Sequence, residues 1–317
     1  MKKNNIGGSD LQVAPLAFGG NVFGWTIDEA TSEKLLDQFT EAGFNLVDTA
    51  DVYSRWKPGN SGGESETIIG NWMKKRGNRK DMVIATKGGG DMGQGGKDIS
   101  GKYLIKAVNA SLARLQTDYI DLYQTHWDVE GTPIEETLGA YQQLIKEGKI
   151  RYIGASNFSA GRLKEALLVS ERDGLPKYES FQPEYNLYSR KGFEEELEII
   201  CRENNIGVLN YYSLAAGFLT GKYRSEADAG KSVRGGGSKQ YLNDRGYKIL
   251  GALDQVAAEY NTAQASVAIA WLIARPSITA PIASATSVNQ LKTLTDAATL
   301  QLSPATIQLL DEASEWR

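Results

Sequence analysis

The sequence has 317 residues, 41% of them hydrophobic and 23% charged, and a formal net charge of −4 at pH 7. A chain of this length buries roughly three quarters of its unfolded surface, so it needs neither a disulfide nor a metal to fold. The acidic balance argues against nucleic acid as the main partner. With one cysteine, Cys201, and one histidine, His126, the chain has too few soft ligands for a zinc site, and we expect no metal.

The N-terminal segment carries Lys2 and Lys3, but no apolar run follows them, which argues against a signal peptide. No stretch approaches the roughly 18 apolar residues that a membrane-spanning helix requires. A lone cysteine cannot form an internal disulfide, which fits a reducing compartment. The sequence therefore predicts a cytoplasmic protein that does not act at a membrane.

Short apolar runs alternate with longer amphipathic runs along the chain. Most of the short runs are continuously apolar, as expected for parallel strands buried on both faces, and eight are predicted strands: 16–18, 45–49, 82–86, 120–124, 152–155, 180–182, 207–210 and 278–282. The amphipathic runs predict helices at 31–41, 104–115, 134–147, 160–171, 193–204, 247–260, 264–274 and 288–297, and a last one that starts at Ser303-Pro304.

Repeated strand-then-helix units without a break in composition predict one domain over residues 1–317, folded as a (β/α)8 TIM barrel. An open, doubly wound α/β sheet is the alternative. Before the first strand, residues 6–13 contain Gly7-Gly8-Ser9-Asp10 and predict an N-terminal β-hairpin that plugs the bottom of the barrel.

Three glycine-rich stretches, 57–64, 88–96 and 229–239, are predicted loops. Within the second, Gly88, Gly90 and Gly93 have the spacing of the dinucleotide-binding fingerprint. That fingerprint must open a helix whose N-terminus meets the pyrophosphate. Here helical periodicity begins only near residues 100–104, so we reject a Rossmann fold.

Four polar residues occur where barrel active sites lie, at the C-terminal ends of strands and in the following loops. Asp48 ends the second predicted strand and Tyr53 follows it, Lys87 follows the third, and His126 follows the fourth. Taken singly, Tyr53, Lys87 and His126 are each better explained by packing or solvent exposure than by catalysis. Four such groups on consecutive strands indicate a shared catalytic site.

The chemistry that suits these groups is proton transfer by a phenol. A free tyrosine has a pKa near 10, and a neighbouring lysine cation lowers it toward the range of a useful acid. Asp48 is expected to pair with Lys87, and His126 to donate to a carbonyl oxygen or orient the substrate. Because no side chain supplies hydride, a nicotinamide cofactor is implied.

Several segments, in order and over nearly the whole chain, resemble the aldo-keto reductase superfamily: Asp48-Thr49-Ala50-Asp51-Val52-Tyr53, Ala85-Thr86-Lys87, Gln124-Thr125-His126-Trp127, Gly154-Ala155-Ser156-Asn157-Phe158, Phe181-Gln182-Pro183-Glu184-Tyr185-Asn186 and Gly217-Phe218-Leu219-Thr220-Gly221-Lys222-Tyr223. The resemblance implies a TIM barrel with an N-terminal hairpin that reduces aldehydes or ketones to alcohols. Tyr53 would be the general acid, with Asp48, Lys87 and His126 completing a tetrad. The alternative is a non-catalytic, cofactor-binding accessory subunit, as in potassium-channel subunits of this fold.

The resemblance also implies a cofactor site. Ser156, Asn157 and Gln182 would bind the nicotinamide carboxamide, and Tyr211 would stack on the ring, with Tyr212 as its rival. The remaining positions would follow the pyrophosphate or lie near the cofactor: Tyr212, Ser213, Leu214, Gly217, Leu219, Gly20, Asn21 and Asp48.

At the phosphate end, this chain departs from the family pattern. Ser284, Thr286 and Gln290 stand where a lysine or arginine often holds the 2′-phosphate, and Thr293-Leu294 replaces a frequent Glu-Asn pair that reads adenine. Hydroxyl groups and the amides at a helix N-terminus also bind phosphate. We therefore expect NADP(H), with NAD(H) as the alternative.

A small-molecule carbonyl substrate is expected between aromatic residues at the barrel mouth, which suit apolar or sugar faces. The predicted substrate residues are Trp25, Tyr53, Trp56, His126 and Trp127. In the third glycine-rich stretch, solvation is favoured over anion binding for the basic residues Lys231, Arg234 and Lys239.

Overall fold

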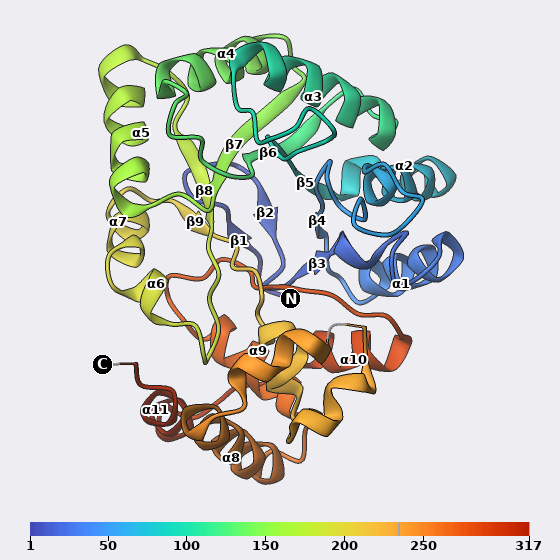
Figure 1. The fold of residues 1–317 in the computed structure, drawn as a ribbon, viewed down its shortest axis with the longest axis vertical. Coiled ribbons are helices and arrows are strands. Elements are labelled where there is room, and N and C mark those ends of the chain that lie inside the picture. Colours follow the sequence, from blue (N-terminus) through green and yellow to red (C-terminus); the bar gives the residue numbers. More distant parts are fainter. Residues whose placement is uncertain (234, 317) are drawn as a thin grey trace.

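The computed structural model describes residues 1–233 and 235–316. Its central sheet has eight strands, hydrogen-bonded in the order β10-β3-β4-β5-β6-β7-β8-β9, and each neighbouring pair is parallel. Figure 1 shows the strands curled around a common centre, with helices outside them. The strands are β3 Ala17–Gly19, β4 Leu46–Asp48, β5 Val83–Gly88, β6 Ile120–Thr125, β7 Ile150–Ser156, β8 Tyr178–Gln182, β9 Gly207–Val208 and β10 Ile282–Ala283.

The two ends of the sheet are joined by hydrogen bonds between the β9 region and the segment that leads into β10. Val208 forms a parallel bridge with Ile278, and the amide of Ile282 donates to the carbonyl of Asn210 at 2.9 Å. The strands therefore close into a ring, and the predicted (β/α)8 TIM barrel is confirmed over the open sheet.

The eighth strand is shorter than predicted and begins later in the chain. The sequence predicts a strand at 278–282, whereas β10 comprises only Ile282–Ala283. Pro281 has no N–H to donate to a strand ladder, which interrupts pairing before Ile282. Ile278 keeps only its isolated bridge. The other seven predicted strands overlap the observed ones.

Most helices lie where the apolar periodicity places them. Several begin at a side chain that accepts from a backbone amide of the first turn, as N-caps do: Asp28, Ser100, Ser159, Asn243, Ser287 and Ser303. The predicted helices correspond to α1 Glu29–Glu41, α3 Gly101–Leu115, α4 Ile134–Lys146, α5 Ala160–Asp173, α8 Asp244–Glu259, α9 Gln264–Ile273, α10 Val288–Ala297 and α11 Pro304–Ala313. In Figure 1, α8 and α11 lie side by side at the lower end of the view.

Two helical segments differ from the prediction. Helix α2, Glu64–Arg76, is absent from the predicted set, although it buries Ile68, Ile69, Trp72 and Met73. Its Gly70 resembles a helix breaker, but a Cβ there would lie 2.7 Å from the backbone carbon of Leu115, so the glycine allows α2 to pack on α3. The predicted helix 193–204 is divided into α6 Lys191–Glu194 and α7 Leu197–Glu203, since Glu196 has a non-helical φ of −139°.

The predicted hairpin is formed by β1 Asn4–Asn5 and β2 Gln12–Val13, which pair antiparallel. Its residues Ile6, Leu11 and Val13 are buried in one cluster with inward-facing strand residues such as Leu46, Ala85, Leu122, Leu209 and Ile282. The hairpin therefore fills the barrel from the end opposite the predicted tetrad.

The glycine-rich loops agree with the rejection of a Rossmann fold, since α3 begins only at Gly101, well after Gly93. The stretch 229–239 contains parts of two 3-10 helices, Glu226–Lys231 and Gly235–Tyr241. Lys231 lies 2.6 Å from Asp228 and Lys239 lies 3.1 Å from Glu226, so both are paired within this exposed segment. Arg234 lies outside the described residues.

Within residues 1–233 and 235–316, no helix has the length and apolar content needed to cross a bilayer.

Candidate active site

Three of the four predicted catalytic residues meet at the amino group of Lys87. Its Nζ donates to Asp48 Oδ2 at 2.7 Å, to the carbonyl oxygen of Thr49 at 2.8 Å, and to the hydroxyl oxygen of Tyr53 at 2.9 Å. Lys87 lies on β5 and Asp48 on the adjacent β4, and both side chains are buried. The ammonium group thus fixes the Tyr53 hydroxyl relative to the barrel.

The charge state of Lys87 follows from two opposing effects. Burial alone would lower its pKa, but the negative charge of Asp48 and the hydrogen-bonded phenol of Tyr53 outweigh burial, and the pKa of Lys87 is raised. A buried cation persists only where a partner and hydrogen bonds compensate for lost solvation. Lys87 is therefore a cation at neutral pH.

His126 follows β6 and completes the group. Its ring centroid lies 6.0 Å from that of Tyr53, and its ring stacks on Trp127 at 3.6 Å. Burial, aided by the charges of Lys87 and Lys97, lowers the pKa of His126 well below its usual range, so the imidazole is neutral. Its Nδ1 is buried and has no partner among the described residues. Since a proton on Nδ1 would bury an unsatisfied donor, the tautomer with the proton on Nε2 is favoured.

The predicted carboxamide-binding residues lie at the ends of β7 and β8, beside this group. Ser156 Oγ donates to the carbonyl of Gln182 at 2.8 Å, and Asn157 Nδ2 donates to the carbonyl of His126 at 2.9 Å. Gln182 Nε2 donates to Asp48 Oδ1 at 2.9 Å. The structure thus connects the amide side chains to the tetrad through direct hydrogen bonds.

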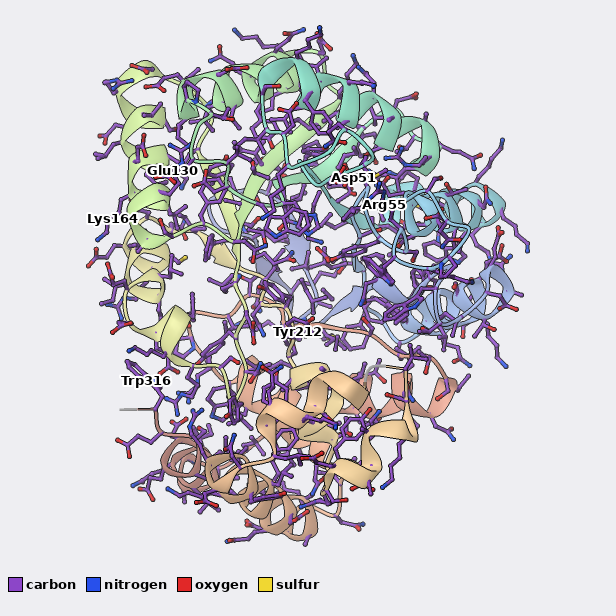
Figure 2. All side chains as sticks on the ribbon, viewed as in Figure 1. Asp51, Arg55, Glu130, Lys164, Tyr212 and Trp316 are labelled. Atoms are coloured by element: carbon purple, nitrogen blue, oxygen red, sulfur yellow. The ribbon has the colours of Figure 1, made fainter. Side chains whose placement is uncertain are left out.

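The predicted stacking residue and its rival differ in accessibility. Tyr211 is partly buried, and its hydroxyl donates to Asn157 Oδ1 at 2.8 Å. Tyr212 has φ 54° and is 50% exposed, and Figure 2 shows it near the centre of the view. Both aromatic rings therefore stay candidates for contact with a planar ligand.

The segment after Tyr212 turns tightly, and several of its hydrogen-bonding groups are paired within the protein. Ser213 Oγ is buried and donates to the carbonyl of Ile282 at 2.8 Å, and Leu219 is fully buried. The amides of Gly217 and Leu219 donate to the carbonyl of Leu214 at 2.9 and 3.2 Å. Ser213 and Leu219 thus have no free side-chain surface to offer a ligand.

The predicted phosphate end lies where β3 and β10 run side by side. Ser284 Oγ donates to Asn21 Oδ1 at 2.6 Å, and the carbonyl of Gly20 accepts from Ser65 Oγ. At the start of α10, Gln290 Oε1 accepts from both the amide and the hydroxyl of Thr286. Gln290 therefore engages both donors of Thr286, just before the N-cap of α10.

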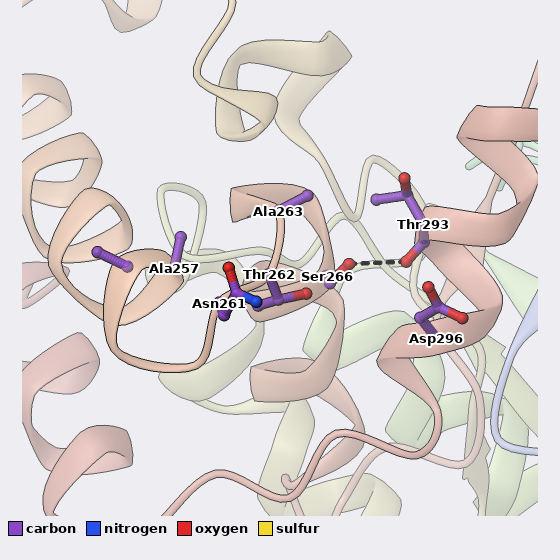
Figure 3. A pocket seen from close by; sticks show the side chains of 8 residues that line it. Ala257, Asn261, Thr262, Ala263, Ser266, Thr293 and Asp296 are labelled. Carbon is purple, nitrogen blue, oxygen red and sulfur yellow. Dashed lines mark hydrogen bonds between the residues drawn. The ribbon is translucent and has the colours of Figure 1, made fainter.

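A surface hollow of about 560 Å³ lies beside α10, between α8 and α9 (Figure 3). Thr293 lies at its edge, and its carbonyl accepts from Ser266 Oγ at 2.8 Å, the contact drawn as a dashed line. The hollow is lined by Ala257, Ala258, Asn261, Thr262, Ala263, Ser266, Thr293 and Asp296. Thr293 therefore borders a space with small and polar walls.

The predicted substrate aromatics are connected by ring contacts that run through Tyr53 and His126. Trp56 is 48% exposed and makes edge contacts with Trp25, at 5.4 Å, and with Tyr53, at 6.0 Å. Trp127 joins these contacts through its stack on His126. The ring of Tyr53 thus contacts the rings of both Trp56 and His126.

Gln124, which lies two residues before His126 on β6, was not among the predicted site residues. Its Nε2 donates to Asp48 Oδ1 at 3.3 Å, and its Oε1 accepts from Gln182 Nε2 at 3.1 Å. Side chains alternate along a strand, so Gln124 points into the barrel next to Lys87, its partner in the sheet register. That alternation was the signal that could have identified it.

Asp51, which also was not among the predicted site residues, is influenced by charges on α2 and β5. Its carboxyl is 1% exposed, and Oδ1 has no partner among the described residues. Burial, reinforced by the negative charge of Glu66, raises the pKa of Asp51 to about 8, although Arg114 and Lys87 oppose the shift. Asp51 therefore holds a proton at neutral pH.

We expect Asp51→Asn to gain stability relative to the parent as the pH rises. Above about pH 4 the unfolded chain loses this proton while the folded chain keeps it, so the parent loses roughly 1 kcal/mol per pH unit until about pH 8. The asparagine variant lacks that loss. Urea unfolding of both proteins at several pH values measures it, and parallel pH dependences of the unfolding free energy would contradict the protonated state.

No group of three or more metal-ligating side chains occurs among residues 1–233 and 235–316. An acidic, a phenolic, a cationic and an imidazole side chain thus lie close together in a (β/α)8 barrel. The family model described as Aldo/keto reductase family matches residues 15–315, and the chain belongs to this family.

Curated relatives align over most of their own length. A probable voltage-gated potassium channel subunit beta of Oryza sativa subsp. japonica is 34% identical over 300 residues, covering 92% of this chain and 89% of the relative. Protein tas of Escherichia coli (strain K12) is 31% identical over 328 residues, covering 96% and 94%. The NADP(+) aldo-keto reductase yakc of Schizosaccharomyces pombe is 31% identical over 296 residues, covering 90% and 83%.

Proposed function

We propose that this protein reduces an aldehyde or ketone to an alcohol, with Tyr53 as the proton donor and a nicotinamide as the source of hydride. The observation that supports this most is the contact of Lys87 Nζ with Tyr53 at 2.9 Å, inside a buried ion pair with Asp48. Family membership implies the coarser activity, NAD(P)H-dependent carbonyl reduction. The roles of individual residues are our assignment.

In the proposed reaction, Tyr53 gives its hydroxyl proton to the carbonyl oxygen of the substrate. The cation of Lys87 stabilises the phenolate that is left behind, which lowers the barrier to proton transfer. Neutral His126 donates from Nε2 to the same oxygen and orients it. The substrate site is bordered by Trp25, Trp56 and Trp127, which exclude water from this contact.

The residues at the barrel mouth fit a nicotinamide cofactor. Gln182 Oε1 accepts no hydrogen bond from the described residues, which leaves one amide acceptor open beside Asp48. Tyr211 and Tyr212 offer aromatic faces nearby. We assign cofactor contacts to Gly20, Asn21, Asp48, Ser156, Asn157, Gln182, Tyr211, Tyr212, Ser213, Leu214, Gly217, Leu219, Ser284, Thr286 and Gln290. Because Ser213 and Leu219 are buried, they would contribute backbone groups only.

We assign NADP(H) as the preferred cofactor. The hydroxyls of Ser284 and Thr286, once turned away from Asn21 and Gln290, and the amides at the start of α10 would hold the 2′-phosphate without a basic side chain. The relative from Schizosaccharomyces pombe is named for NADP(+), which supports this choice. On α10 itself, Lys292 is paired with Asp296 at 2.7 Å.

Thr286→Arg should strengthen selectivity for NADPH over NADH by about tenfold at low salt, because a guanidinium forms charge-assisted hydrogen bonds with phosphate. Fluorescence titration with both cofactors measures the ratio of dissociation constants, and added salt should reduce the gain. Thr299→Arg, beyond the C-terminal end of the same helix, is the matched control and should leave the ratio unchanged. Equal ratios in the two variants would contradict the assigned phosphate position.

The proposed activity is tested by titrating the protein with NADPH, adding a panel of aldehydes and ketones, and following the absorbance of the reduced cofactor. Oxidation that depends on the carbonyl compound supports the enzyme. A second candidate is a non-catalytic accessory subunit, which is favoured by the rice relative named as a probable channel subunit. NADPH binding without oxidation across the panel would support that candidate.

A further inference from the structure

Gln124 is the central member of a buried hydrogen-bonded group inside the barrel. It is fully buried on β6, with Lys87 as its register partner on β5 and Gly154 as its partner on β7. A Cβ on Gly154 would lie 3.0 Å from Gln124 Cγ, so the glycine leaves room for the amide side chain against β7. Both neighbouring strands therefore restrict the position of Gln124.

The hydrogen bonds determine which way each amide points. Asp48 Oδ1 accepts hydrogen bonds from Nε2 of Gln182 at 2.9 Å and from Nε2 of Gln124 at 3.3 Å. Gln124 then turns its Oε1 to the second N–H of Gln182, at 3.1 Å. Both protons of the Gln182 amide are thus engaged within the protein, while its Oε1 receives no donor from the described residues.

We propose that Gln124 is a positioning residue that, with Asp48, fixes the amide of Gln182 so that its oxygen faces the cofactor and accepts the N–H of the nicotinamide carboxamide. This inference rests on the proposed function. Without Gln124, one proton of Gln182 loses its acceptor, and the bond to Asp48 alone holds the amide less firmly against rotation. A buried amide with an unmet donor is costly, so the two orientations are unequal in the native protein.

The test compares two cofactors that differ in one group. NADPH carries a carboxamide, and its 3-acetylpyridine analogue carries a methyl ketone that has no N–H. In the parent, NADPH should bind about three- to tenfold more tightly, the usual contribution of one hydrogen bond. In Gln124→Met, which is similar in volume but has no polar amide, this preference should largely disappear. Binding of 2′-phospho-ADP-ribose, which lacks the nicotinamide, should stay within about twofold.

Two further variants separate positioning from loss of stability. Thr125→Val removes a buried hydroxyl from the same strand, but that hydroxyl faces away from the barrel interior and contacts Tyr141 at 2.8 Å. It should preserve the cofactor preference. Gln124→Glu keeps an acceptor for Gln182 and should also preserve the preference. It places a second carboxyl beside Asp48, so its turnover relative to the parent should fall as the pH rises.

An unchanged preference for NADPH in folded Gln124→Met would overturn the positioning role while leaving the proposed function intact. Equal weakening of NADPH and 2′-phospho-ADP-ribose in that variant would also overturn it, because the defect would then not be confined to the nicotinamide. Failure of the parent to bind NADPH would instead reject the proposed function itself. A circular dichroism melt of each variant establishes that it is folded.

Discussion

Tyr53→Phe should bind NADPH as the parent does and should lose about 100- to 10,000-fold in turnover with an aldehyde, the range expected for removal of a general acid. The phenyl ring keeps the edge contacts with Trp56 and His126, so the walls of the site remain. Only the hydroxyl that Lys87 contacts is removed. Stopped-flow measurement of cofactor oxidation, together with a binding titration, distinguishes the two effects.

The matched control for this variant is Tyr260→Phe. The hydroxyl of Tyr260 also takes part in hydrogen bonds, accepting from the amide of Ser303 at 2.9 Å, but it lies between α8 and α11, away from the barrel mouth. Its removal should leave turnover near the parental rate. Parental turnover in Tyr53→Phe would show that another group, such as His126, supplies the proton.

Lys87→Met should reduce both turnover and stability. The variant removes the cation that stabilises the Tyr53 phenolate, and it leaves Asp48 charged and buried without its partner. Removing one partner of a buried ion pair typically costs about 3–5 kcal/mol of unfolding free energy. The midpoint of urea unfolding should therefore fall markedly. Turnover should fall by at least about 100-fold.

The double variant Lys87→Met with Asp48→Leu separates these effects. Removing both charges eliminates the unpaired carboxylate, so much of the lost stability should return. Turnover should stay low, because no cation remains beside Tyr53. A double variant that recovered turnover together with stability would show that Lys87 serves only the fold.

The placement of the tetrad could be predicted because it depends on local features. Asp48, Lys87 and His126 each stand at or just after the end of an apolar run, and parallel strands bring such ends to one rim. The hairpin was predictable for a similar reason, since turn residues separate its short apolar flanks. These inferences needed only the order of residues along single elements.

Features that depend on contacts between elements could not be predicted. The helix α2 was missed because Gly70 and the buried Glu66 disguise its apolar face. Gly70 is explained by close packing on α3, and Glu66 by its ion pair with Arg114 of α3 at 2.7 Å and its hydrogen bond from Thr86 of β5. The orientation of the Gln124 amide depends on three strands at once. The protonated state of Asp51 likewise follows from burial, which the motif around it does not reveal.

The most direct measurement of the central claim uses NADPH that carries deuterium at the reactive carbon of the nicotinamide, mixed with an aldehyde and the parent protein. We predict an alcohol product with deuterium on the former carbonyl carbon, seen by mass spectrometry, and loss of most of this product with Tyr53→Phe. Bound cofactor that gives no labelled alcohol with any carbonyl compound tested would contradict the assignment of this site as a carbonyl reductase.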